Sequence, residues 1–348
     1  FLFDMTVNNK MYMEASTKLE LGNCNLRERK YSRWQGEMVK IDLITGFLGS
    51  GKTTFIKKYA KYLIDQGENI GILENDYGAV NVDMMLLKDM EGENCELEMI
   101  AGGCDEDCHR RRFRTKLIAM GMCGYDRVIV EPSGVYDVDE FFDALREDPI
   151  DRWYEIGNVI TVVDAKLEPE LSDEADYLLA SEAANAGCIV LSRSQEATEE
   201  EIKNTIAHLN QAMEKVQCRR RFADEIVAKD WETFDEADYE KLLSCGYVPE
   251  NYRKMHIEEG ETFKSLYFMN LNKTKDEITE AAKKVLEDKE CGQVFRVKGF
   301  LKDEDGKWME LNATHQEMRI CPIPEGQEVV IVIGEELNEE KIQQYFSM

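Results

Sequence analysis

Eight residues near the start of the chain have the spacing of a phosphate-binding loop. Residues 46–53 read GFLGSGKT and fit the pattern G-x-x-x-x-G-K-[ST]. Glycines let such a backbone wrap closely, so that several N–H groups point at phosphate oxygens. Lys52 would reach the β- and γ-phosphates, and the Thr53 hydroxyl would ligate Mg²⁺. The predicted nucleotide contacts are Gly46, Gly49, Ser50, Gly51, Lys52, Thr53 and Thr54.

An acidic residue follows the apolar run at residues 126–130, where a P-loop protein holds its magnesium ion. Glu131 is the first residue after this run, and Gly134 comes three positions later. We expect Glu131 to hold the water shell of Mg²⁺ and Gly134 to offer its N–H to the γ-phosphate.

A second acidic stretch follows the apolar run at residues 69–73. It reads ENDYG over residues 74–78, and Asp83 lies a little further on. Asp76 or Asp83 would sense the γ-phosphate or position the attacking water, and the sequence does not decide between them. The simpler interpretation is a polar loop with one helix cap.

Between these stretches, residues 102–109 read GGCDEDCH and gather groups that bind metals. Thiolate and imidazole suit Zn²⁺ or a similar transition metal, and carboxylates extend the choice towards harder ions. We therefore expect Cys104 and Cys108 to bind a metal. The alternative is a solvated acidic turn with two incidental cysteines.

Short apolar runs alternate with helical stretches around these motifs. This pattern predicts a mostly parallel sheet covered on both faces, with ligands at the carboxyl ends of its strands. We expect this α/β P-loop domain over residues 38–221. The expected strands are 39–44, 69–73, 126–130, 157–164 and 187–191, and the expected helices are 54–63, 137–146, 173–186 and 198–216.

The remaining residues divide into three parts. Residues 1–37 lack clear periodicity, and we expect them to be an extension outside the fold. Residues 222–262 are rich in Asp and Glu and are predicted to be a linker. Residues 263–348 predict a small α+β domain with a hairpin around Asp305-Gly306. Its other expected elements are strands 265–271 and 327–333 and helices 274–287 and 338–346.

Composition restricts the partners and the compartment. The net charge of −27 would repel nucleic acid and anionic membranes, so we expect neither as a partner. No run of 18 apolar residues and no secretory signal is visible. Ten scattered cysteines beside a nucleotide motif favour reduced thiols and a cytoplasmic protein.

Together these motifs resemble the CobW-like family of GTPases, relatives of the hydrogenase- and urease-maturation GTPases that deliver metals. Residues 44–54 are similar to the family's I-T-G-F-L-G-S-G-K-T-T at every position. The resemblance extends over about residues 38–348. Its other motifs are 75–78 (NDYG), 131–134 (EPSG), 162–164 (VVD) and 296–300 (RVKGF) with Trp308.

The chain departs from the family's metal motif, G-C-x-C-C. Cys104 matches its opening, but Glu106 and Asp107 stand at the later cysteine positions and Cys108 falls one residue too late. Either the site persists with Cys108 or carboxylates as ligands, or its metal preference has changed.

The chain also departs from the family's guanine-reading motif, N-K-x-D. Here the strand at residues 188–191 is followed by Ser192, Arg193, Ser194 and Gln195. The resemblance implies that Ser192, Arg193 and Gln195 meet the base, with the Arg193 stem lying over it. Gln195 offers a neutral amide in place of a carboxylate, which would reduce the preference for GTP over ATP. GTP is still the expected nucleotide, with ATP as the other possibility.

The resemblance implies a GTP-binding, slowly hydrolysing metal chaperone or insertase. Its nucleotide state would be coupled to metal transfer or to the maturation of a client metalloprotein. One alternative is an ATP- or GTP-dependent activator of a client, for example a corrinoid enzyme, without a cargo metal of its own. Another is a nucleotide sensor that hydrolyses nothing.

Overall fold

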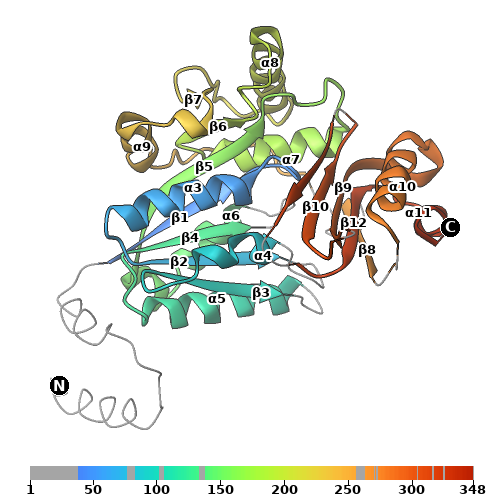
Figure 1. Ribbon diagram of the computed structural model, residues 1–348. Coiled ribbons are helices and arrows are strands. Elements are labelled where there is room, and N and C mark those ends of the chain that lie inside the picture. The colour runs from blue at the N-terminus through green and yellow to red at the C-terminus, as the bar shows by residue number, and fades with distance from the viewer. Residues whose placement is uncertain are drawn as a thin grey trace, which may run out of the picture.

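A computed structural model describes residues 38–347, apart from 77–82, 102–105, 133–137, 256–262, 270, 272, 304, 316 and 324–325. The predicted extension at residues 1–37 therefore lies outside the described residues. The described chain forms two sheets, and the second lies beside the carboxyl edge of the first (Figure 1). We propose that the chain divides into its two units between α9 (Glu236–Leu243) and β8 (Phe263–Met269).

The first sheet has the strand order β3-β2-β4-β1-β5-β6-β7, and its strands pair in parallel. Strands such as β4 are buried at every position, because helices cover both faces. The predicted P-loop fold with a mostly parallel sheet is confirmed. The strands are β1 (Val39–Thr45), β2 (Ile70–Asp76), β3 (Cys95–Ala101), β4 (Arg127–Pro132), β5 (Tyr154–Asp164), β6 (Cys188–Ser192) and β7 (Ile226–Val227).

Two hydrophobic clusters show which helices cover each face. Apolar residues of α3 (Lys52–Asp65), α4 (Asp83–Leu87) and α9 join one cluster. Apolar residues of the other four helices that cover this first sheet join the second cluster, so the sheet is the middle of three layers. No helix in the described ranges is long and apolar enough to cross a membrane. The four helices of the second cluster are α5 (Glu106–Gly121), α6 (Val138–Leu145), α7 (Asp173–Ala184) and α8 (Glu199–Lys215).

Two parts of the first unit differ from the sequence predictions. β3 was not predicted, because Glu96 and Glu98 alternate with apolar residues in a strand at the sheet edge. The predicted acidic linker at 222–262 carries β7, which pairs with β6, and helix α9. Asp235 caps α9 through a reciprocal capping box with Asp238, so acidic residues start a helix here.

The second sheet is antiparallel, with the order β11-β10-β9-β12-β8. The predicted hairpin is confirmed, because β9 pairs with β10 and Gly306 adopts a positive φ of 78° in the turn. Helices α10 (Lys275–Glu287) and α11 (Glu339–Ser347) share one hydrophobic cluster with the sheet. Its strands are β8, β9 (Gln293–Lys302), β10 (Trp308–Ala313), β11 (Met318–Pro322) and β12 (Val329–Glu335).

Candidate nucleotide site

The loop between β1 and α3 has a backbone that glycine makes possible. Gly46, Gly49 and Gly51 have φ values of 144°, 80° and 101°. A Cβ on Gly46 would lie 2.2 Å from the Val162 carbonyl oxygen, so no side chain fits there. Gly51 is the N-cap of α3 and supplies no side-chain cap. The first N–H groups of the helix are thus suited to an anionic ligand.

Lys52 and Thr53 are buried at the start of α3. The Lys52 ammonium donates to the Gly46 carbonyl oxygen over 2.7 Å, which closes the loop on itself. The Thr53 hydroxyl donates to the Glu131 carboxylate over 3.0 Å. The structure therefore brings the predicted P-loop residues together with the predicted magnesium ligand at the end of β4.

A second carboxylate, Glu74, stands beside Glu131. The two residues are in register on the neighbouring strands β2 and β4, and both side chains are buried. Two adjacent buried carboxylates favour a cation, and carboxylate and hydroxyl oxygens are the ligands that Mg²⁺ prefers. This donor set fits Mg²⁺. Glu74 was not among the predicted site residues, because only the sheet register places it beside Glu131.

Other predicted residues fall on segments whose side chains are not described. Asp76 ends β2 and Asp83 begins α4, so both backbones lie at the carboxyl edge of the sheet. Gly134 lies outside the described residues. The roles of these three residues stay predictions.

The loop after β6 contacts the P-loop through Arg193. Its guanidinium pairs with the Asp164 carboxylate at the end of β5 and lies 3.4 Å from the Gly49 carbonyl oxygen. It also pairs with Glu317, in the turn between β10 and β11, over 3.3 Å. Ser192 is buried, whereas Gln195 is exposed, with its amide nitrogen 3.5 Å from Glu196. Ser192 is thus enclosed and Gln195 is open to solvent, and the roles of Ser192, Arg193 and Gln195 at a base stay predictions.

A known family includes this combination of P-loop and parallel sheet. The family model described as "CobW/HypB/UreG, nucleotide-binding domain" matches residues 40–223, more than half of the chain. The chain belongs to the CobW/HypB/UreG family. The resemblance of the sequence motifs to CobW-like proteins is confirmed.

Three curated relatives of this CobW/HypB/UreG chain each match about half of it. Zinc chaperone YeiR of Escherichia coli (strain K12) is 29% identical over 164 residues, covering 47% of this chain and 49% of YeiR. Zinc chaperone YjiA of the same strain is 26% identical over 183 residues, covering 49% and 55%. Zinc-regulated GTPase metalloprotein activator 1 of Schizosaccharomyces pombe (strain 972 / ATCC 24843) is 24% identical over 194 residues, covering 52% and 44%. The chain thus spans about half the length of each.

The cysteine motif of this CobW/HypB/UreG chain begins after β3. Cys104 lies outside the described residues, and Cys108 is partly buried in the first turn of α5. His109 is buried, and its burial, followed by the charge of Arg112, lowers its pKa to about 4. Among the residues that the structure describes, no three His, Cys, Asp or Glu side chains gather as a metal site. Metal binding by Cys104 and Cys108 stays a prediction.

Proposed function

We propose that this protein binds GTP with Mg²⁺, hydrolyses it slowly, and couples its nucleotide state to the transfer of a metal ion to a client metalloprotein. The Thr53–Glu131 hydrogen bond carries the nucleotide part of this proposal, because it joins the P-loop helix to the predicted magnesium ligand. The names of the curated relatives support zinc as the cargo.

Each group has one task in the proposed reaction. The loop N–H groups and Lys52 would bind the phosphates and stabilise the charge that develops on the transferring phosphoryl group. Thr53 and Glu131 would hold Mg²⁺, which neutralises charge on the β- and γ-phosphates when bound. Asp76 or Asp83 would position water or sense the γ-phosphate.

The strand order supports coupling between nucleotide and metal. β1 leads into the P-loop and β3 leads towards Cys104, with β4 and β2 between them. Three strand spacings separate β1 from β3, a distance of about 14 Å. β2, which ends at Asp76, lies between the magnesium strand and the cysteine strand. Loss of the γ-phosphate would loosen the segment after β2 and release the metal held by Cys104 and Cys108.

The nucleotide part is tested with Lys52→Ala and a matched control, Lys61→Ala, which removes an exposed lysine from the same helix. Titration of both variants and the unmodified protein with GTP and with ATP, in the presence and absence of Zn²⁺, should show GTP binding lost in Lys52→Ala alone. Unchanged GTP binding by Lys52→Ala would contradict the proposal.

The metal part is tested by the zinc content of Cys104→Ser and Cys108→Ser after equilibrium dialysis against Zn²⁺. Each substitution should lower the bound zinc, and exposed Cys321→Ser should leave it unchanged. Equal zinc content in all four proteins, with GTP hydrolysis retained, would favour the client activator without a cargo metal. A protein that binds GTP but shows no turnover in excess Mg²⁺ would instead be a nucleotide sensor.

A further inference from the structure

The P-loop is in direct contact with two consecutive residues of the second sheet. Phe47 packs edge-on against Phe295, with ring centroids 5.9 Å apart. A Cβ built on Gly49 would lie 3.2 Å from both Cδ and Nη1 of Arg296. Phe295 and Arg296 of β9 therefore both reach the loop that is built to hold phosphates.

A β-bulge explains how neighbours in one strand reach the same loop. Successive side chains of a regular strand point to opposite faces. In β9, however, Arg296 is opposite Ile333 of β12, and Val294 is opposite Gly334. Phe295 is therefore the extra residue of a bulge. Bulges redirect side chains and are common beside active sites.

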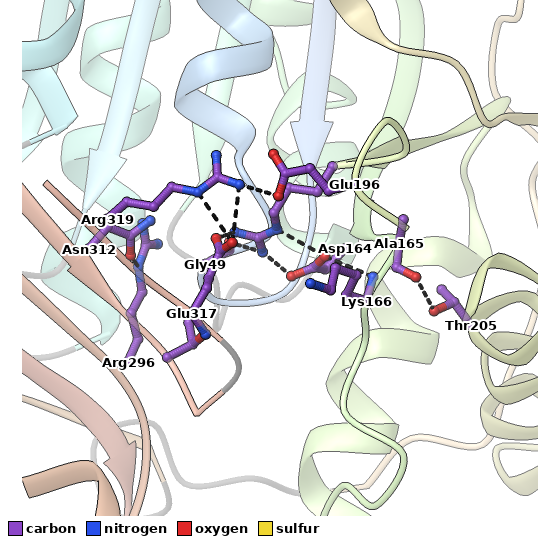
Figure 2. A network of polar contacts seen from close by, with 12 residues as sticks. Gly49, Asp164, Ala165, Lys166, Glu196, Thr205, Arg296, Asn312, Glu317 and Arg319 are labelled. Carbon is purple, nitrogen blue, oxygen red and sulfur yellow. Dashed lines mark hydrogen bonds and ion pairs between the residues drawn. The ribbon is translucent and has the colours of Figure 1, made fainter. Parts of the chain in front are cut away.

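The side chain of Arg296 is held in place from the next strand. Its Nε donates to the Asn312 amide oxygen of β10 over 2.7 Å (Figure 2). This hydrogen bond fixes the direction of the guanidinium. A guanidinium carries five N–H donors in a planar fork, so one held through Nε has its two outer nitrogens directed away from that anchor, in the geometry that matches phosphate oxygens.

Other positive groups stand close to Arg296 at this edge of the P-loop. Arg193 contacts the Gly49 carbonyl oxygen, and Arg319 pairs with Glu196 and Glu317. Burial is the main cause that lowers the pKa of Arg193, and the charges of Arg296 and Arg319 add to it. The carboxylates of Asp164, Glu196 and Glu317 pair with Arg193 and Arg319, so the charges of these two arginines are largely balanced within the cluster.

We infer that Arg296 is a phosphate-binding residue of the nucleotide site, supplied by the second sheet. The inference rests on the nucleotide-binding part of the proposed function. It goes further by making the nucleotide site a product of both units. Arg296 reads the phosphate chain and not the base. Its loss should therefore weaken GTP, ATP and inorganic tripolyphosphate by the same factor.

The experiment compares Arg296→Ala, Arg296→Gln and Arg296→Lys with Lys302→Ala. Lys302 is an exposed cation at the end of the same strand, where it lies over the Trp308 ring. Affinities for a non-hydrolysable GTP analogue and for tripolyphosphate are measured by calorimetry, and thermal unfolding of the nucleotide-free proteins reports on folding. We expect the Ala and Gln variants to bind both probes at least tenfold more weakly. The Lys variant should lose less, and Lys302→Ala should stay within twofold of the unmodified protein.

Affinities of Arg296→Gln and Arg296→Ala within twofold of that of Lys302→Ala would overturn the inference. Weakened binding of the GTP analogue with unchanged binding of tripolyphosphate would also overturn it, because the phosphates are then not what Arg296 reads. If Arg296→Ala lowers the unfolding temperature, the affinities of Arg296→Lys and Arg296→Gln are compared instead. Weaker binding by the neutral Gln variant than by the charged Lys variant then supports the inference, and equal binding contradicts it. If the unmodified protein binds neither GTP nor tripolyphosphate, the proposed function itself is wrong. If the unmodified protein binds GTP, Lys52→Ala abolishes this binding and the Arg296 variants bind normally, only the inference about Arg296 is wrong.

Discussion

Thr53 and Glu131 lie 78 positions apart in the chain, and a 3.0 Å hydrogen bond joins them at the mouth of the P-loop. The bond links the first turn of α3 to the end of β4. The register of β2 with β4 adds Glu74 beside it. These contacts fix the start of α3 relative to the two strands that carry the carboxylates.

The first prediction concerns magnesium. Glu131→Gln keeps the shape of the side chain but replaces a charged ligand of Mg²⁺ with a neutral amide, so the gain in GTP affinity that Mg²⁺ provides should fall at least tenfold. The measurement is the affinity for GTP with Mg²⁺ and with EDTA. Glu155→Gln, an exposed position on β5, is the control. An equal gain from Mg²⁺ in both variants would exclude Glu131 as a magnesium ligand.

The second prediction concerns the base. Gln195→Asp restores a carboxylate that can accept two hydrogen bonds from guanine, so the preference for GTP over ATP should rise about tenfold. Gln195→Asn keeps a neutral amide and should leave the ratio of the two affinities unchanged. If Gln195→Asp strengthens ATP as much as GTP, the loop after β6 does not read the base.

The local sequence was sufficient to predict those parts of the candidate site that are contiguous in the chain. The glycines of residues 46–53 fix the loop, and the apolar runs around it predicted most strands of the first sheet. β3 escaped prediction because an edge strand exposes one side, so glutamates interrupt its apolar pattern.

The missing parts of the site depend on contacts between distant residues. Nothing in the sequence of residues 74–78 distinguishes Glu74 from the other acidic residue, Asp76, until the register places Glu74 beside Glu131. The approach of Arg296 to Gly49 depends on a β-bulge in the pairing of β9 with β12. No local sequence pattern predicted this bulge. Spacing along the chain therefore predicted that the loop at residues 46–53 and Glu131 act together, and the tertiary structure added Glu74 and Arg296.

The third prediction concerns a buried ionic network at the middle of β1. Asp42 is fully buried, and one of its oxygens accepts 2.7 Å hydrogen bonds from the Tyr59 hydroxyl and the Arg127 guanidinium. Its other oxygen accepts from the Asn158 N–H over 2.7 Å. Asp42→Ala would leave these donors in the core without this acceptor, so the free energy of unfolding should fall by about 3–5 kcal/mol.

Chemical denaturation measures the free energy of unfolding that Asp42→Ala loses. The dependence of this free energy on denaturant concentration should be the same in the variant and the unmodified protein. The control is Glu199→Ala, because Glu199 forms an exposed 3.9 Å pair with Lys203 on α8 and its removal should not change stability measurably. Similar midpoints for the two variants would show that the buried network contributes little.

The last prediction concerns pH and rests on Glu182 of α7. Its side chain is 1% exposed, and neither carboxyl oxygen has a hydrogen-bond partner among the described residues. Its backbone oxygen accepts from the hydroxyls of Thr45 and Thr161 over 3.1 and 2.9 Å, which holds this turn of the helix against β1 and β5. Burial raises the pKa of Glu182 to about 8, and the charge of Lys52 opposes the rise.

A carboxyl whose pKa is higher in the folded chain stabilises the fold while it is protonated. That contribution is complete below the ordinary pKa near 4.5 and is lost as the pH rises through about 8. The free energy of unfolding should therefore fall by several kcal/mol over this range in the unmodified protein. In Glu182→Gln, which stays neutral, this component of the pH dependence should disappear, whereas exposed Glu199→Gln should retain it. Parallel pH curves for the Glu182→Gln and unmodified proteins, from denaturation at each pH, would show that Glu182 is already ionised in the fold at neutral pH.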